Sequence, residues 1–202
     1  MHIVLSDMEG VFTPEIWINV AEKTGVSELR LTTRDISDYD VLMTRRLEIL
    51  RTHGLKLDDI TRVIATMEPL PGATEFLDRL RRSGPVIIVS DTFEQFAGPL
   101  IRRLGWPTLF CHTLEVAPDG TVTGYQLRLD DGKRRTVDAL QGLNYRVIAV
   151  GDSYNDIRML QAAEAGILFK PPENVRAEFP DLPATNDYEA LYTEIRRAVG
   201  GS

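Results

Sequence analysis

The segment IVLSDMEGV at residues 3–11 decides the fold, because a short apolar run ends there in two acidic residues. Two further apolar runs, VIIV at 86–89 and VIAV at 147–150, also end in polar loops, SDT at 90–92 and GDSYND at 151–156. Continuous apolar runs of this length are typical of parallel strands buried on both faces. Ligands bind at the carboxyl ends of such strands, so we expect the three loops to meet at one edge of a sheet.

Helical patterns fill the gaps between the apolar runs, and this alternation predicts an α/β protein with a Rossmann-like, three-layer parallel-sheet core. Residues 13–68 show helical patterns alone and directly follow the first strand, which indicates a small helical cap inserted over the strand ends. The core then consists of residues 1–12 and 69–202. Alternation around a turn at Pro118–Gly120 predicts a β-hairpin over 113–130, within the core.

Local signals predict where several helices begin and end. Thr13, followed by a proline and a glutamate, predicts a helix start, and Gly25 predicts the end of that helix. Ser37 or Asp38 predicts the start of a second helix, and Asp58 that of a third.

Composition narrows the class of protein. The 202 residues are 43% hydrophobic and 26% charged, as in ordinary globular proteins. Acidic residues (30) outnumber lysines and arginines (23), and the net charge of −7 disfavours a nucleic-acid partner. Cys111 alone excludes an intramolecular disulfide, and no segment resembles a secretory signal or a membrane span. We therefore expect a cytoplasmic protein without a nucleic-acid or membrane partner; composition leaves the oligomeric state open.

Asp7 and Glu9 form the first candidate site. Residues two apart in an extended segment point to the same side, so both carboxyl groups face one ligand. Carboxylates this close repel unless a metal neutralises them or one holds a proton. The pair suits a nucleophile beside a general acid and base. Two acids in a surface turn explain it equally well.

The GDSYND loop at 151–156 supplies the second candidate site. Asp152 ends a strand, Asp156 lies four residues on, and Asn155 adds a polar group between them. Two carboxylates with water form a hard-oxygen site that suits Mg²⁺. Asp156 by itself is also explained as an acid that complements a helix dipole.

Ser90 and Lys133 are candidates for holding a phosphate. Ser90 lies at a strand end just before a predicted helix, and a hydroxyl with free N–H groups at a helix start binds phosphate. Ser90 or Asp91 as an ordinary helix cap explains the same pattern. Lys133 follows a predicted turn; alone it is a solvated loop lysine, and beside the other groups it balances phosphate charge.

The acid pair, the serine, the lysine and the GDSYND loop occur in the order found in the haloacid dehalogenase superfamily, which the chain resembles along its whole length. EGVFTPEIWI at 9–18, SDTF at 90–93, CHTLEV at 111–116 and GDSYNDIRML at 151–160 closely resemble the phosphoserine phosphatases that are also phosphoserine:homoserine phosphotransferases. The resemblance implies a Mg²⁺-dependent enzyme that takes the phosphoryl group from O-phospho-L-serine and passes it to water or homoserine.

The resemblance also implies a role for each candidate residue. Asp7 would form an aspartyl-phosphate, and Glu9 would protonate the departing oxygen and then deprotonate the acceptor. The resemblance implies that Mg²⁺ is bound by Asp7, the main-chain carbonyl of Glu9 and Asp152, with Asp156 close by. It implies that the phosphoryl oxygens are bound by Ser90, Lys133 and Asn155.

The chain departs from the family pattern at two positions. Most phosphatases of the superfamily carry Asp where this chain has Glu9, which shifts the acid relative to the nucleophile. Many phosphoserine phosphatases have two glycines after the serine, where this chain has Asp91 and Thr92. We expect Asp91 to narrow the loop that binds the substrate phosphate.

Arg46 is a candidate for recognising the rest of the substrate. At 100° per residue it falls near the middle of an apolar helix face, whereas Arg45 lies toward its edge. A cation there needs an anion, either a substrate carboxylate or an internal salt-bridge partner. The resemblance implies that Arg46 binds the substrate carboxylate and Glu15 the amine, although a glutamate at a helix start explains Glu15 as well.

Two other functions stay open. A phosphatase of the same superfamily that acts on another small phosphate ester would not need Arg46 and Glu15. A non-catalytic phospho-acceptor module also places acids, a hydroxyl and a lysine around Mg²⁺. Such a module has no helical insertion and no second carboxylate two positions after the acceptor.

Overall fold

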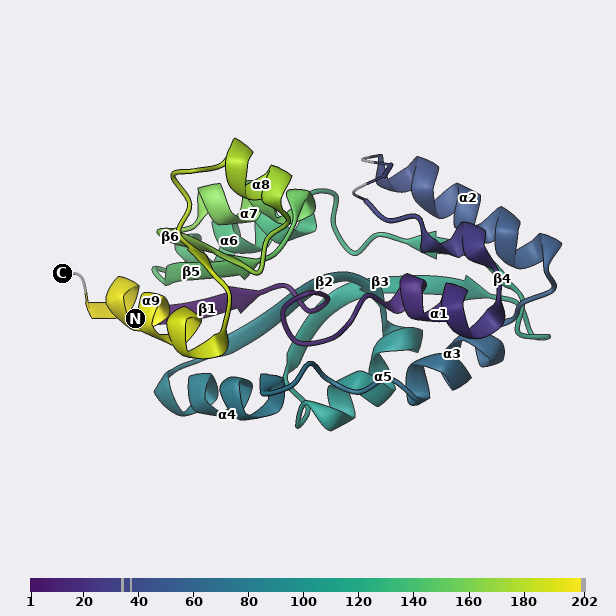
Figure 1. The fold of residues 1–202 in the computed structure, drawn as a ribbon, viewed down its shortest axis with the longest axis horizontal. Coiled ribbons are helices and arrows are strands. Elements are labelled where there is room, and N and C mark those ends of the chain that lie inside the picture. The colour runs from purple at the N-terminus through teal and green to yellow at the C-terminus, as the bar shows by residue number, and fades with distance from the viewer. Residues whose placement is uncertain (34, 37, 201–202) are drawn as a thin grey trace.

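The computed structural model describes residues 1–33, 35–36 and 38–200. Within them, seven strands form one sheet in the order β4-β3-β2-β1-β5-β6-β7 (Figure 1). Every neighbouring pair is parallel except β3 and β4. The strands are β1 (His2–Ser6), β2 (Val86–Phe93), β3 (Thr108–Val116), β4 (Val122–Gln126), β5 (Arg146–Gly151), β6 (Ala165–Phe169) and β7 (Ala184–Thr185).

Helices cover both faces of this sheet, as expected for parallel strands (Figure 1). They are α1 (Ile16–Thr24), α2 (Tyr39–Thr52), α3 (Leu57–Ala65), α4 (Ala73–Ser83), α5 (Glu94–Arg103), α6 (Gly132–Gly142), α7 (Ile157–Ala162), α8 (Glu173–Glu178) and α9 (Tyr188–Gly200), with short 3₁₀ turns η1 (Ser27–Arg30) and η2 (Tyr154–Asp156). No helix in the described part of the chain is both long enough and apolar enough to cross a membrane.

The central strand β1 shows how the two faces are filled. Val4 packs into the cluster that contains residues of α4, α5 and α9, whereas Ile3 and Leu5 pack into the cluster with α6, α7 and α8. Successive side chains of a strand point to opposite faces, so an unbroken apolar run serves both clusters. The predicted three-layer α/β architecture is confirmed.

Helices α1, α2 and α3 lie between β1 and β2 in the chain and stand at one end of the molecule, beside β4 (Figure 1). The β3–β4 hairpin turns where Ala117 N–H donates to the carbonyl of Thr121 (2.9 Å). It contacts these helices: Tyr125 Oη donates to Asp40 of α2, and Leu57 N–H of α3 donates to the carbonyl of Gly120. The division into a core and a cap of residues 13–68 stays a prediction.

Two predicted helix starts are wrong, and tertiary contacts explain both. Helix α1 begins at Ile16 rather than after Thr13, because Thr13 N–H donates to the carbonyl of Met8 (3.0 Å) in the preceding loop. Helix α3 begins at Leu57, ahead of Asp58, where its first N–H bonds to the hairpin.

Two other predicted boundaries are confirmed. Asp38 caps α2 by accepting a hydrogen bond from Val41 N–H (3.0 Å), whereas the alternative, Ser37, lies outside the described residues. Gly25 ends α1 in the left-handed conformation, with φ of 74°.

The prediction that a strand ends at Ser90, just before a helix, is also wrong. Strand β2 continues through Ser90 to Phe93, which pairs with His112 of β3 after an irregularity in register. Helix α5 begins only at Glu94. Ser90 therefore lies within the extended segment rather than directly before α5.

Candidate active site

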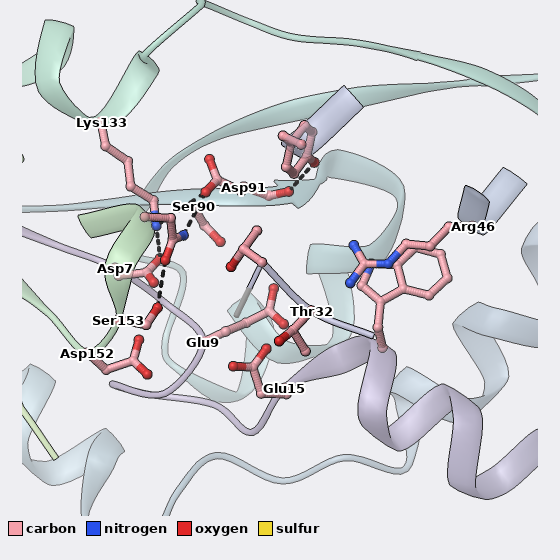
Figure 2. A pocket seen from close by; sticks show the side chains of 14 residues that line it. Asp7, Glu9, Glu15, Thr32, Arg46, Ser90, Asp91, Lys133, Asp152 and Ser153 are labelled. Carbon is pink, nitrogen blue, oxygen red and sulfur yellow. Dashed lines mark hydrogen bonds and ion pairs between the residues drawn. The ribbon is translucent and has the colours of Figure 1, made fainter. Parts of the chain in front are cut away.

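The strand ends meet around a pocket (Figure 2). The predicted residues come together there from β1, β2, β5, α2 and α6. The lining consists of Asp7, Glu9, Glu15, Trp17, Thr32, Thr33, Tyr39, Arg46, Ser90, Asp91, Lys133, Asp152, Ser153 and Asn155. Asp156, the remaining predicted site residue, is buried directly behind this lining.

Lys133 is the cation at one end of the pocket, beside Asp7 and Asp91. Its Nζ lies 2.8 Å from Asp156 Oδ1, 3.1 Å from Asp7 Oδ1 and 3.5 Å from Asp91 Oδ2, with the side chain 5% exposed. Burial alone would lower the pKa of Lys133, but the three carboxylates outweigh it and hold that pKa well above its usual range. One permanent positive charge therefore faces three carboxyl groups.

The carboxyl groups around Asp7 outnumber the single nearby cation, Lys133. Burial first, and then the charge of Asp156, raise the pKa of Asp7 well above its usual range, although Lys133 opposes the shift. One carboxylate oxygen from each of Asp7, Asp152 and Asp156 lies within 4.8 Å of the others, and all three residues are buried. This buried set of hard oxygen donors fits a divalent cation, which would supply the missing charge.

Asp156 organises the loop that carries Asp152. Its Oδ2 accepts hydrogen bonds from the N–H groups of Asp152 (2.9 Å) and Ser153 (3.1 Å), and its Oδ1 accepts one from Lys133 (2.8 Å). Both oxygens are thus engaged within the protein. This favours a place behind the metal ligands, close to the ion, as the family resemblance implies.

Glu9 lies apart from the acid cluster. Its Oε2 accepts a hydrogen bond from Ile16 N–H (2.8 Å) at the start of α1. Burial, followed by the charge of Glu15, raises the pKa of Glu9 to about 8. A carboxyl group with that pKa keeps its proton at neutral pH and is able to donate it. The implied metal contact through the main-chain carbonyl of Glu9 stays a prediction.

Asp91 is held in a network at the same end of the pocket as Lys133. Asn155 Nδ2 donates to its Oδ2 (2.8 Å), and His112 Nε2 lies 3.5 Å from its Oδ1. Burial alone would raise the pKa of Asp91, but Lys133, His112 and Asn155 hold it well below its usual range. The amide of Asn155 is oriented further by Ser153 Oγ, which donates to Asn155 Oδ1 (2.6 Å).

Arg46 stands at the opposite end of the pocket, facing Glu9, Glu15 and Thr32 (Figure 2). It is 6% exposed, and burial lowers its pKa to about 10, so it stays charged at neutral pH. Among the described residues, no carboxylate lies within ion-pair distance of its guanidinium, and its Nε has no hydrogen-bond partner. The internal salt bridge considered above is therefore absent from the described residues, which favours a ligand carboxylate.

Several lining residues were not among the sequence candidates: Trp17, Thr32, Thr33, Tyr39 and Ser153. Trp17 is not singled out by the sequence, because a tryptophan is more often a core residue than a site residue. The helical face that singled out Arg46 also contains Tyr39, and the GDSYND loop contains Ser153. These two patterns could therefore have identified both residues. Thr32 and Thr33 precede α2 in a loop with no comparable signal.

Gly10 lets two loops approach each other. It has φ of 77°, and a Cβ there would lie 2.4 Å from the Cγ of Asp152. Gly151 has a similar role, since its Cβ would lie 2.4 Å from the Cβ of Asp156. Only glycine at these positions allows the carboxylates to lie where they do.

Replacing Gly10 by alanine is expected to displace Asp152 and to raise the Mg²⁺ concentration for half-maximal activity at least roughly tenfold. Gly25→Ala is the matched control, because Gly25 has φ of 74° with nothing within 4 Å of its Cβ position. It shares the backbone strain of about 1 kcal/mol without the collision. Thermal unfolding and Mg²⁺ titration of both variants measure this; equal Mg²⁺ requirements would contradict the role of Gly10.

Comparison with known proteins agrees with this geometry. A family model described as haloacid dehalogenase-like hydrolase matches residues 3–164. The phosphoserine phosphatase ThrH of Pseudomonas aeruginosa is 59% identical over 202 residues, which are 100% of this chain and 98% of that protein. A phosphoserine phosphatase of Pseudomonas syringae pv. tomato is 55% identical over 198 residues, 98% of this chain and 84% of that protein.

A solved structure of a phosphoserine phosphatase in apo form shares the fold. Its TM-score is 0.78 at 22% identity, over 95% of this chain and 98% of that one. Phosphatases of this family are generally metal-dependent, and the buried acid cluster of Asp7, Asp152 and Asp156 supplies suitable ligands. By its fold, its site and its family match, the chain belongs to the haloacid dehalogenase-like hydrolases.

Proposed function

We propose that the protein is a Mg²⁺-dependent phosphoserine phosphatase that works through an aspartyl-phosphate on Asp7 and also transfers the phosphoryl group to homoserine. The observation that carries the proposal is the pocket with two unlike ends. Lys133 and Ser90 suit a phosphate at one end, and the buried Arg46 suits a carboxylate at the other. The relatives named phosphoserine phosphatase support this substrate.

The charges suit an O-phosphorylated amino acid. Arg46 offers a guanidinium to the substrate carboxylate, and Glu15, which lines the same end, offers a carboxylate to the amine. Lys133 and Ser90, which also line the pocket, would bind the phosphoryl oxygens. Each charged group of phosphoserine would therefore lie beside a residue of opposite charge.

The proposed reaction has two steps. The carboxylate of Asp7 attacks phosphorus, the bond to the serine oxygen breaks, and Glu9 gives its proton to that oxygen. Glu9 then takes a proton from water or from the homoserine hydroxyl, whose oxygen attacks the aspartyl-phosphate and restores Asp7. Bound to Asp7 and Asp152, Mg²⁺ would neutralise charge on these carboxylates and on the phosphoryl oxygens.

Release of inorganic phosphate from phosphoserine in the presence of Mg²⁺ tests hydrolysis, and the same assay with added homoserine tests transfer. The proposal predicts that homoserine reduces free phosphate while phosphohomoserine accumulates. Hydrolysis without any formation of phosphohomoserine would show that the protein does not transfer the phosphoryl group to homoserine. Faster turnover of another phosphate ester would favour the first alternative function, and stable phosphorylation without turnover would favour a phospho-acceptor module.

Replacing Arg46 by alanine is expected to raise KM for phosphoserine roughly 100-fold, because a charge-assisted, two-pronged contact is lost. KM for an aryl phosphate without a carboxylate should change little. Arg45→Ala is the matched control, since Arg45 is the preceding residue of α2 and is exposed. An equal change in KM for both substrates in the Arg46→Ala variant would show that Arg46 does not bind the substrate carboxylate.

A further inference from the structure

The indole of Trp17 lies directly under the guanidinium of Arg46. The Cζ of Arg46 is 4.6 Å from the centre of the Trp17 ring. Trp17 is the second residue of α1 and Arg46 belongs to α2, so two helices bring the pair together, and both residues line the pocket. A cation over the face of tryptophan is attracted by the negative face of the ring.

Trp17 is itself held in place. It is 7% exposed, and its ring packs edge to face against Phe96 of α5, with ring centres 5.6 Å apart and an angle of 74° between the planes. Because the indole is packed between Phe96 and Arg46, it acts as a fixed surface for the guanidinium rather than following its movements.

The guanidinium has few other contacts. Nη2 donates to the carbonyl of Leu31 (2.8 Å), and Nη1 makes a weak contact with Met43 Sδ (3.6 Å). Two-pronged recognition of a carboxylate requires the plane of the guanidinium to be correct. Among the described residues, the Trp17 ring and the Leu31 carbonyl therefore set that plane, with the weak Met43 contact beside them.

An aromatic ring suits this task better than an acid. The face of the indole attracts the cation without accepting a hydrogen bond from its N–H groups, so the ring does not compete with a ligand for them. A carboxylate in the same position would neutralise Arg46 and compete with the ligand.

We propose that Trp17 is a positioning residue for amino-acid recognition, whose ring holds the Arg46 guanidinium in the plane that binds the substrate carboxylate. The inference rests on the proposed function, in which Arg46 binds that carboxylate. It assigns to Trp17 a role in substrate selectivity rather than in the chemical step.

The kinetic test compares phosphoserine with phosphoethanolamine, which keeps the phosphate and the amine but lacks the carboxylate. Trp17→Leu should raise KM for phosphoserine roughly tenfold, since a desolvated cation–π contact is lost, with kcat nearly unchanged. Trp17→Phe should restore most of the affinity. Neither variant should change kcat/KM for phosphoethanolamine by more than about twofold. In an Arg46→Ala background, Trp17→Leu should have no further effect.

Trp106 provides the matched control. It is 63% exposed and lies 6.0 Å from Arg102 Cζ in a surface cation–π pair, so Trp106→Phe should leave both substrates unaffected. Because the chain has 2 tryptophans, this variant also leaves Trp17 as the only indole. In an Asp7→Asn/Trp106→Phe protein, phosphoserine should change the Trp17 emission and phosphoethanolamine should change it much less.

The outcomes separate the two proposals. If Trp17→Leu and Trp17→Phe weaken both substrates equally, or if both ligands change the emission equally, Trp17 is only a packing residue and this inference is wrong. If the wild type prefers phosphoserine and Arg46→Ala removes the preference while the Trp17 variants keep it, this inference alone fails. If the wild type does not prefer phosphoserine over phosphoethanolamine, both proposals fail.

Discussion

Asparagine in place of Asp7 is expected to lower kcat for phosphoserine by about four orders of magnitude or more, because an amide cannot form the acyl-phosphate. The change is nearly isosteric, and Met8 N–H, which donates to Asp7 Oδ1 (2.8 Å), keeps an acceptor in the amide oxygen. Retention of more than a few per cent of wild-type activity would contradict the assignment of Asp7 as the nucleophile.

The same variant should keep its fold in the absence of metal. Burial and the nearby acids raise the pKa of Asp7 in the folded state, so its protonated form favours folding below about pH 4. That contribution is lost as the pH rises through the folded-state pKa. At neutral pH the asparagine variant avoids this loss, and its Tm in EDTA should equal or exceed that of the wild type. Thermal unfolding across pH 4 to 8 measures the difference, which should vanish near about pH 4.

Replacing Lys133 by methionine is expected to damage both stability and activity. The change leaves Asp7, Asp91 and Asp156 without the cation that contacts all three. Removing one partner of a buried ion pair destabilises a protein by about 3–5 kcal/mol. In a chain of this size that corresponds to a fall in Tm of roughly 10 °C, measured in EDTA. Turnover should fall at least about 100-fold, since a charge that stabilises the phosphoryl group is lost.

Lys56 offers the matched control for this change. Its Nζ pairs with Asp119 at 3.1 Å on the surface, where an ion pair contributes at most about 1 kcal/mol. Lys56→Met should therefore leave Tm and turnover close to the wild type. Adding Asp156→Asn to Lys133→Met should recover part of the lost stability but none of the activity. Equal Tm values for the two lysine variants would show that Lys133 does not hold the buried acids together.

The sequence predicted those parts of the site whose residues lie at the ends of strands. The apolar runs before Asp7 and Asp152 are long enough to indicate strands, and the polar residues that follow each run show where the strand stops. Parallel strands put such ends at one edge, so convergence of these loops followed from the fold class alone. Arg46 was identified because a helix has a fixed period, and a cation on an apolar face is conspicuous.

The remaining features depend on contacts between segments far apart in the chain. Thr13 and Asp58 have the side chains of helix caps, yet bonds to Met8 and to the β3–β4 hairpin move the helix starts. Ser90 was predicted to end a strand just before a helix, but pairing of Phe93 with His112 extends the strand past it. These outcomes depend on which strands are neighbours, which local signals do not encode.

Asp91 illustrates the same limit within the site. Its position after Ser90 predicts that it narrows the loop that binds the substrate phosphate, but its partners come from three other segments, through Lys133, Asn155 and His112. The sequence contains no spacing that connects these residues. The network exists because β2 lies between β1 and β3 in the sheet, which brings His112 to the side of Asp91.

Trapping the phosphorylated enzyme tests most directly whether Asp7 carries the phosphoryl group. The enzyme is mixed with phosphoserine and Mg²⁺, quenched in acid within one turnover, and reduced with borohydride, which converts an aspartyl-phosphate to homoserine. Mass spectrometry of the peptide that contains Asp7 should then show homoserine at position 7, and the Asp7→Asn protein should show none. Turnover with an unmodified Asp7 peptide, or with a phosphorylated Ser90, would contradict the account.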